Sequence, residues 1–449
     1  MKSLYLAAML AAALPVSALA QDGTVRPERV RAHESFLASA ALQGRGSATR
    51  DEAIAATYVA SQFESFGLKP APGMTGYLQS ANVVRTSLRG AKFSVDGAAM
   101  TPTVLVGGAS SVAGKPVVFS GGDLKAFPEG DIILAASDVP AFQLYRAASA
   151  HKAKLVILRE SAATRELLGR FGGKPRMATY LEDGSAGGLG GEDAALITLP
   201  AEDFDALAAK QDASVRLDLD VEKQVSATTN AIGWLPGTDP RAGVLLVTAH
   251  HDHLGLRPDG TVMFGANDDA SGTTAVIELA RALSSGKRMK RGILFVTYGS
   301  EEIGGFGSTY FGAHPPVPLT DIVANLEIEM IGAQDPKLPA GYMMMTGFER
   351  STMGETLKAH GALVTADPYP EQHFFERSDN YSLAVRGVVA HTVSGWATTP
   401  TYHQPTDTLE SLDIGFMTRA IQSLVAPLRS LADSDARPQW KPGGKPEGR

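Results

Sequence analysis

Residues 244–253 read Val-Leu-Leu-Val-Thr-Ala-His-His-Asp-His, an apolar run that ends in histidines and an aspartate. A continuous apolar run predicts a strand that is buried on both faces of a sheet. Similar runs at 293–298, 322–330 and 388–393 alternate with helical patterns at 270–285, 351–360 and 414–432. This alternation predicts an α/β fold with a mixed, mostly parallel sheet sandwiched by helices.

The length and net charge of the chain limit the classes of protein to which it can belong. At 449 residues it exceeds one typical hydrophobic core, so we expect two globular units. The formal net charge of −7 comes without any cluster of Lys and Arg, which argues against a nucleic-acid or anionic-membrane partner. The chain has no cysteine, which excludes disulfides and the cysteine that anchors a bacterial lipoprotein.

The first residues have the layout of an export signal. Lys2 precedes an apolar run from Leu4 to Leu14, and Ala-Leu-Ala follows at 18–20. The run is shorter than the ~20 residues of a membrane-spanning helix, so we expect a cleavable signal peptide at 1–20 and no stable membrane anchor. The predicted location is periplasmic or extracellular.

Changes in the sequence pattern divide the rest of the chain into segments. Residues 21–90 begin the main domain, with a capping box at Thr49 to Glu52 that opens a core-facing helix. The pattern over residues 91–222 predicts a β-rich insert with one helix at 141–151. We expect residues 223–435 to form the rest of the main domain. Residues 436–449 predict a disordered tail. The expected strands of the insert lie at 103–106, 115–119, 131–135, 155–158 and 195–199.

Polar residues follow three of the predicted strands. His250 ends the first strand, Glu301 and Glu302 follow the strand at 293–298, and Glu329 lies in the last part of 322–330. Binding sites of open α/β sheets form at the carboxyl ends of the strands, so we expect these side chains to share one site.

Residue chemistry suggests zinc at this site. His250 and Asp252 lie on one side of an extended segment, so Asp252 can orient a metal-bound His250, although His251 and His253 are alternative ligands. Asp268, before the helix at 270–285, can bridge two zinc ions, although N-cap chemistry also explains an aspartate there. Of two adjacent glutamates, one can bind metal while the other transfers protons. Minimal motifs of zincin, serine and cysteine peptidases are absent from the sequence.

Together these motifs resemble the co-catalytic dizinc aminopeptidase family, which includes secreted bacterial leucyl aminopeptidases. The matching segments are 42–46, 63–68, 249–255, 265–272, 300–304 and 403–408, and the region 91–222 resembles the protease-associated domain of many members. The resemblance implies the zinc exopeptidase fold, two Zn²⁺ ions and a peptide substrate.

The resemblance also implies a role for each site residue. One zinc would lie on Asp268, Glu302 and His403, and the other on Asp268, Glu329 and His250. The catalytic residues would be Glu301 as general base and acid, Asp252 beside His250, and Tyr402 as a hydrogen-bond donor to the oxyanion. A cis peptide is implied at Asp268–Asp269. Glu329 stands where the family usually has aspartate, which suggests a shifted or weaker second metal, and Glu327 is a less favoured substitute.

The leading hypothesis is therefore a zinc-dependent aminopeptidase that uses metal-activated water. A glutamate-releasing carboxypeptidase on the same metals is an alternative, for which Arg377 and Arg386 could bind the substrate carboxylate. A receptor-like homologue without catalysis is a further alternative, but such a protein should have lost metal ligands.

Overall fold

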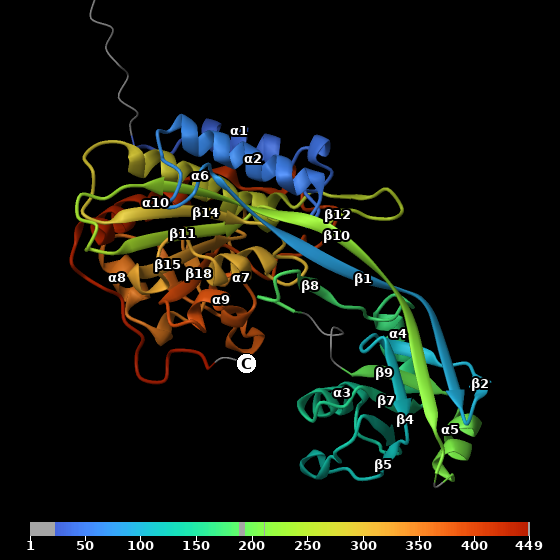
Figure 1. Cartoon of the computed structure of the whole chain (residues 1–449). Coiled ribbons are helices and arrows are strands. Elements are labelled where there is room, and N and C mark those ends of the chain that lie inside the picture. Colours follow the sequence, from blue (N-terminus) through green and yellow to red (C-terminus); the bar gives the residue numbers. More distant parts are fainter. Residues whose placement is uncertain (1–22, 188–193, 211, 448–449) are drawn as a thin grey trace, which may run out of the picture.

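Two large β-sheets and a two-stranded one organise the chain in the computed structural model, which describes residues 23–187, 194–210 and 212–447. The predicted signal peptide at 1–20 lies outside these residues. Of the two large sheets, the larger carries the main unit and the smaller carries the insert (Figure 1). Among the described helices, none is both long and apolar enough to cross a membrane.

The parallel core of the main sheet confirms the prediction from the apolar runs. Its strands β14, β11, β15 and β18 lie side by side and run parallel. Antiparallel pairings flank this core, β10 beside β14 and β16 beside β18, so the sheet is mixed with a parallel centre, and the expectation that it is mostly parallel holds only for that centre. The strands are β10 (Val215–Leu235), β11 (Val244–His250), β14 (Gly292–Tyr298), β15 (Ile322–Glu329), β16 (Met343–Met345) and β18 (Ala390–Ser394).

Helices cover both faces of this core. On one face, α6 (Ser271–Ser284) packs on β11, β14 and β15 and is itself covered by α1 (Pro27–Leu37) and α10 (Ile414–Asp433), with α2 (Arg50–Ser65) beside it (Figure 1). This double cover explains why α6 is buried on all sides. The opposite face carries α7 (Phe306–Ala313) and α9 (Asn380–Ala384).

Only half of the predicted capping box at the start of α2 is formed. Thr49 Oγ1 accepts hydrogen bonds from the N–H groups of Asp51 (3.2 Å) and Glu52 (3.5 Å), as a cap should. Glu52 does not bond back to Thr49. Its buried carboxylate instead accepts from Ala48 N (2.7 Å) and from Ser300 N (3.0 Å), the residue before Glu301.

The insert contains the five predicted strands in the order β3-β9-β7-β6-β5 and the predicted helix α3 (Ala141–Ala150). It also has α4 (Ala162–Arg170) and α5 (Ala201–Ala208), which the sequence analysis missed. Both helices are short: α4 buries only Thr164, and α5 buries only Phe204 and Leu207, which is too few positions to establish a helical period. The strands are β3 (Thr103–Val106), β5 (Val117–Phe119), β6 (Ile132–Ala135), β7 (Leu155–Arg159) and β9 (Ala195–Leu199).

Two long strands connect the units. β1 (Leu78–Val95) pairs with β10 in antiparallel register from Leu78 opposite Ala231 to Val95 opposite Val215, and both strands run from the main unit into the insert (Figure 1). The predicted boundaries at 90/91 and 222/223 therefore fall inside continuous strands. The paired strands β1 and β10 therefore connect the insert to the main unit.

The prediction of a disordered tail is wrong for residues 436–447. Trp440 forms a bridge with Ser351, and its indole Nε1–H donates to Gly387 O at 3.1 Å. The ring packs against His391 and Phe375, at centroid distances of 5.3 and 6.3 Å. The polar composition of the tail gave no sign of these contacts, because one aromatic residue, Trp440, supplies most of them.

Replacing Trp440 should therefore destabilise the main unit. Because the indole is only half-buried, we expect Trp440→Ala to lower the free energy of unfolding by about 2 kcal/mol, less than a fully buried aromatic residue would cost. Urea denaturation followed by circular dichroism measures the change. Glu447→Ala, an exposed site in the same tail, is the control, and equal stability of the two variants would contradict the packing role.

Candidate metal centre

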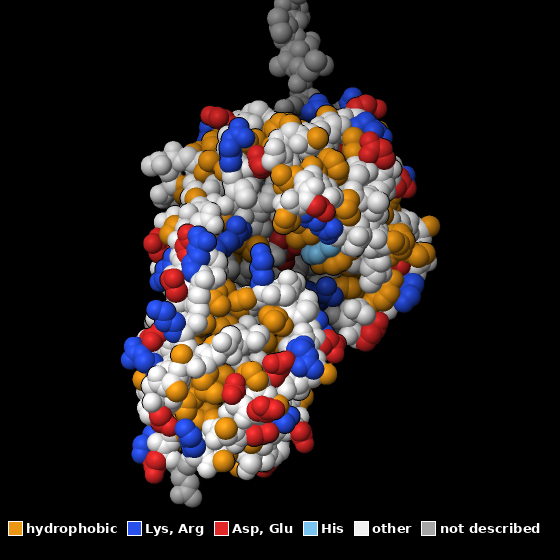
Figure 2. Space-filling view, turned by 90° about the vertical axis from the view of Figure 1, so that its right-hand side faces the viewer, with side chains coloured by type: hydrophobic (Ala, Val, Ile, Leu, Met, Phe, Trp, Pro, Cys, Tyr) orange, Lys and Arg blue, Asp and Glu red, His pale blue; other side chains and the backbone are white. Residues whose placement is uncertain are grey.

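The predicted site residues converge at the carboxyl ends of the parallel strands. His250 ends β11, the Glu301–Glu302 turn follows β14, and Glu329 ends β15. Asp268 comes from the turn before α6, and His403 from the loop between β18 and α10. Figure 2 shows a hollow between the two units in which histidine and acidic side chains are visible.

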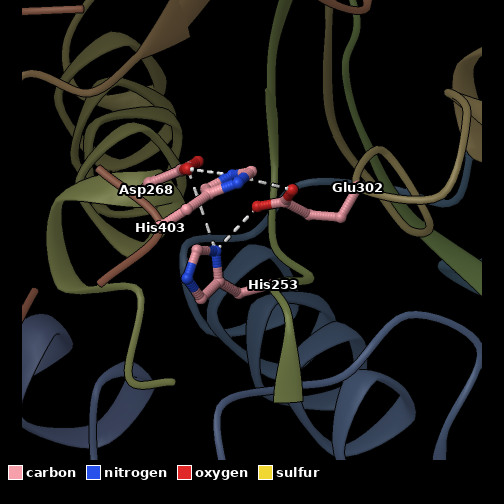
Figure 3. A group of neighbouring side chains, drawn as sticks. All are labelled: His253, Asp268, Glu302 and His403. Atoms are coloured by element: carbon pink, nitrogen blue, oxygen red, sulfur yellow. Dashed lines mark hydrogen bonds and ion pairs between the residues drawn. The ribbon is translucent and has the colours of Figure 1, made fainter. Parts of the chain in front are cut away.

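Four side chains form what we call the first ligand group: His253, Asp268, Glu302 and His403 (Figure 3). His403 Nε2 lies 3.1 Å from Asp268 Oδ2 and 3.0 Å from Glu302 Oε2. His253 Nδ1 lies 2.7 Å from the other oxygen of the same glutamate, Oε1. The structure thus joins the three predicted ligands of one zinc and adds a histidine.

The second ligand group comprises His250, Asp268 and Glu329. His250 Nε2 lies 3.2 Å from Asp268 Oδ1 and 3.9 Å from Glu329 Oε1. Asp268 is common to both groups and turns one oxygen toward each. All five predicted ligand positions are therefore brought together, with Asp268 where a bridging ligand would be.

The donor atoms of both groups fit zinc, which binds histidine nitrogen and carboxylate oxygen. Within each group the donor atoms lie within 4.8 Å of one another. His250 is fully buried, and its Nε2 has no hydrogen-bond partner in the described part of the chain. This nitrogen faces the carboxylates of Asp268 and Glu329 without a hydrogen bond to either, and a bound cation between them would satisfy all three groups.

The electrostatics of the ligands also favour a cation. Burial lowers the pKa of His403, but its hydrogen bonds to Asp268 and Glu302 raise it further, to about 10. Burial raises the pKa of Glu329, and the nearby Asp268 charge adds to the shift. A site that draws protons onto its ligands will exchange them for a metal ion, because metal binding releases ligand protons.

Backbone hydrogen bonds place the shared ligand. The Asp268–Asp269 peptide bond is cis, as the family resemblance implied. Asp407 Oδ2 accepts from Asp268 N at 3.1 Å, so the loop after His403 holds the turn of the shared ligand. Asp269 Oδ1 accepts from Met330 N at 3.0 Å, next to Glu329. The sequence analysis assigned no role to Asp407, whose only signal was its place in the His403 motif.

Asp252 lies where a partner of His250 should be. The His250 Nδ1 atom is 3.6 Å from Asp252 Oδ1 and 3.2 Å from the Asp252 carbonyl oxygen. Asp252 Oδ1 also accepts from Glu301 N at 3.0 Å, and Oδ2 from Ser47 Oγ at 2.6 Å. One buried carboxylate thus links His250 to the turn that carries both glutamates.

The two remaining predicted catalytic residues flank the metal ligands. Burial, opposed by His250 and reinforced by neighbouring carboxylates, holds the pKa of Glu301 well above its usual range. Tyr402 is 36% exposed, and its ring stacks on that of His403 at a centroid distance of 3.9 Å. By contrast His251 points away, with Nδ1 at 3.0 Å from Thr297 Oγ1, so it is a packing residue.

A small cavity of about 40 Å³ adjoins Glu329 and Tyr402. Phe374 and Ser378 line it, whereas Phe375 packs in the core beside β18. Asp379 is buried, and burial raises the pKa of its carboxyl group to about 7. The further lining residues are Met330, Met344, Thr346, Arg377, Thr392, Ser394 and Ala397.

The part of the chain that carries the site is similar to peptidases. Residues 230–427 match the model of Peptidase family M28. The segment includes every residue of both ligand groups.

Individual relatives agree with this match. The chain is 24% identical over 251 residues to aminopeptidase YwaD of Bacillus subtilis, covering 54% of this chain and 53% of the relative. It is 30% identical over 161 residues to leupeptin-inactivating enzyme 1 of Streptomyces exfoliatus, covering 35% and 34%. The matches thus span about half of the first relative's length and a third of the second's.

Solved structures share the architecture of nearly the whole chain. An aminopeptidase from Aneurinibacillus sp. strain AM-1 superposes with a TM-score of 0.56 at 19% identity, covering 92% of this chain and 95% of that one. BSAP, a zinc aminopeptidase from Bacillus subtilis, gives 0.51 at 19% identity, covering 92% and 98%. At these identities the likeness establishes the fold.

The carboxylate of Asp407 should be needed for tight zinc binding although it lies outside both ligand groups. In Asp407→Asn the amide oxygen can accept from only one of the two backbone donors, Asn267 N and Asp268 N, and the amide N–H meets the other, so we expect a 10- to 100-fold loss of zinc affinity, typical of residues that support ligands. Competition with a chromophoric chelator measures it. The control is Asp413→Asn at the N-cap of α10, where asparagine caps equally well. An unchanged affinity in Asp407→Asn would contradict this role.

Proposed function

We propose that the chain is a zinc-dependent aminopeptidase that removes N-terminal residues from peptides. The observation that carries the proposal is the pair of ligand groups joined by Asp268, with Glu301 next in sequence to the ligand Glu302. The relatives named as aminopeptidases support the reaction class. We further propose two Zn²⁺ ions, one for each ligand group.

When bound, zinc would lower the pKa of water and polarise the scissile carbonyl group. Glu301, whose pKa is raised by burial and by neighbouring carboxylates, takes up the proton of the attacking water and passes it to the leaving amine. Asp252 fixes the Glu301 backbone and His250. Tyr402 donates its hydroxyl hydrogen to the oxyanion. The surrounding carboxylates favour the cationic α-ammonium group of the substrate.

The setting of the enzyme is part of the proposal. The sequence of residues 1–20 supports export to the periplasm or the extracellular space, and the insert supports a protease-associated domain. The partner is a peptide, without nucleic acid or a stable membrane anchor. None of these assignments bears on which peptides are cleaved.

A glutamate-releasing carboxypeptidase is the second candidate, because Arg377 lines the cavity beside Glu329. Its guanidinium group lies 5.0 Å above the Phe374 ring and could meet a carboxylate. Arg386, the other candidate, donates to Ser382 O on α9. A receptor-like protein is disfavoured, since every ligand position carries a competent residue. Hydrolysis of aminoacyl-nitroanilides but not N-acylated dipeptides would support the aminopeptidase, and the reverse would support the carboxypeptidase.

Glu301→Gln should abolish hydrolysis and leave zinc bound. The amide cannot accept the proton, while neither ligand group loses a donor. We expect kcat to fall by 10²-fold or more, typical of a lost general base, with about two zinc ions per chain by plasma mass spectrometry. The exposed Glu349→Gln is the control. Near wild-type turnover in Glu301→Gln would remove Glu301 from this role.

The cavity should restrict the side chain that is accepted. A cavity of about 40 Å³ is small, so we expect it to accept a side chain such as that of alanine or serine better than that of leucine. We expect alanyl-nitroanilide to exceed leucyl-nitroanilide in kcat/KM. Because Met344 lines the cavity, Met344→Ala should raise the leucyl-to-alanyl ratio by 10-fold or more, whereas Met353→Ala, buried under α10, should leave it unchanged. A wild-type preference for leucine would contradict this assignment.

A further inference from the structure

We propose that His253 is a positioning residue that holds one oxygen of Glu302 and so directs the other oxygen to the first zinc. This inference rests on the proposed zinc site. It gives a role to a histidine that the sequence analysis considered only as a less favoured alternative to His250.

The two oxygens of Glu302 have different partners (Figure 3). Oε1 lies 2.7 Å from His253 Nδ1, and Oε2 lies 3.0 Å from His403 Nε2. Asp268 Oδ2 is 3.1 Å from the same His403 nitrogen but 3.9 Å from His253 Nδ1. His403, Asp268 Oδ2 and Glu302 Oε2 therefore surround one point, and His253 contacts the oxygen that is turned away from it.

The short contact favours a hydrogen bond over a fourth zinc ligand. Two donor atoms on one tetrahedral zinc with bonds of about 2.0 Å lie ~3.3 Å apart. The pairs made by His403, at 3.0 and 3.1 Å, are near this spacing. The 2.7 Å separation between His253 Nδ1 and Glu302 Oε1 is instead that of a charge-assisted N–H···O bond.

The surroundings of His253 fix its orientation. The side chain is fully buried, and Nε2 has no hydrogen-bond partner among the described residues. Burying an unpartnered N–H costs free energy, so the hydrogen belongs on Nδ1, where it meets Glu302. The backbone is held on both sides, since His253 N donates to Arg45 O (3.0 Å) and His253 O accepts from Ser47 N (3.2 Å). A Cβ on Gly265 would lie 2.4 Å from the ring, so glycine there makes room for it.

The consequence concerns how Glu302 would bind. A free carboxylate can rotate and offer a metal both oxygens. With Oε1 held by His253, Glu302 would offer a metal ion Oε2 alone. Partners of metal-binding residues commonly contribute 10- to 100-fold to metal affinity.

Replacing His253 with asparagine or with glutamine tests the proposal, because the two side chains place their amide nitrogens at different positions. Asparagine places its amide nitrogen close to the position of Nδ1, whereas glutamine places it near Nε2, on the side away from Glu302. In the full-length protein we expect His253→Asn to keep zinc affinity within about 3-fold, and His253→Gln and His253→Leu to lose 10- to 100-fold, in chelator competition. Thermal melting of the zinc-free variants checks folding, and the Asn and Gln pair decides the question if the Leu variant does not fold.

Zinc X-ray absorption separates the donor role from a ligand role. The imidazole contribution should be the same in wild type and His253→Asn if His253 only positions Glu302. Loss of an imidazole, or equal weakening by Asn and Gln, would overturn the proposal, as would unchanged affinity in all three variants. A wild-type protein that binds no zinc would overturn the proposed function itself, which is a distinct result.

Discussion

The site depends on hydrogen bonds from backbone N–H groups to buried aspartates that are not themselves metal ligands. Asp407 binds the N–H of Asp268, Asp252 binds that of Glu301, and Asp269 binds that of Met330, next to Glu329. Each bond fixes a chemically important residue from a different segment of the chain. A hydrogen bond contributes about 0.5–1.5 kcal/mol net, and leaving a buried group unpaired costs more, so these bonds hold the motifs together.

The N-terminal segment extends this scaffold, although it supplies no ligand. Arg45 is fully buried and donates to the carbonyl oxygens of His251 and Gly265. His251 follows the ligand His250, and Gly265 begins the turn that carries Asp268. Glu52 accepts from the N–H of Ser300 and so holds the other turn. Both side chains are buried polar groups, and such groups are costly unless their hydrogen bonds are complete. The first helices are therefore part of the site's construction.

The sequence predicted what has a strong local signal. Continuous apolar runs located the parallel strands, and the polar residues after them located the site, because carboxyl ends of parallel strands meet at one edge. His253 could not be assigned, because its role depends on one rotamer facing Glu302 from another loop. The same limit explains Trp440 and helix α4: a single aromatic anchor, or a helix with one buried residue, leaves no periodicity to find.

The two ligand groups are unequal, and their difference follows from the supporting contacts. In the first group His403 stacks on Tyr402, and Glu302 is held by His253, so its donor atoms lie 3.0–3.1 Å apart. In the second, Glu329 reaches only 3.9 Å from His250, and its longer side chain has one more rotatable bond than the aspartate usual at this position. Ordering that bond costs conformational entropy on metal binding. The first group is thus better organised in advance, and Asp268, which belongs to both, links the geometry of the weaker group to that of the stronger.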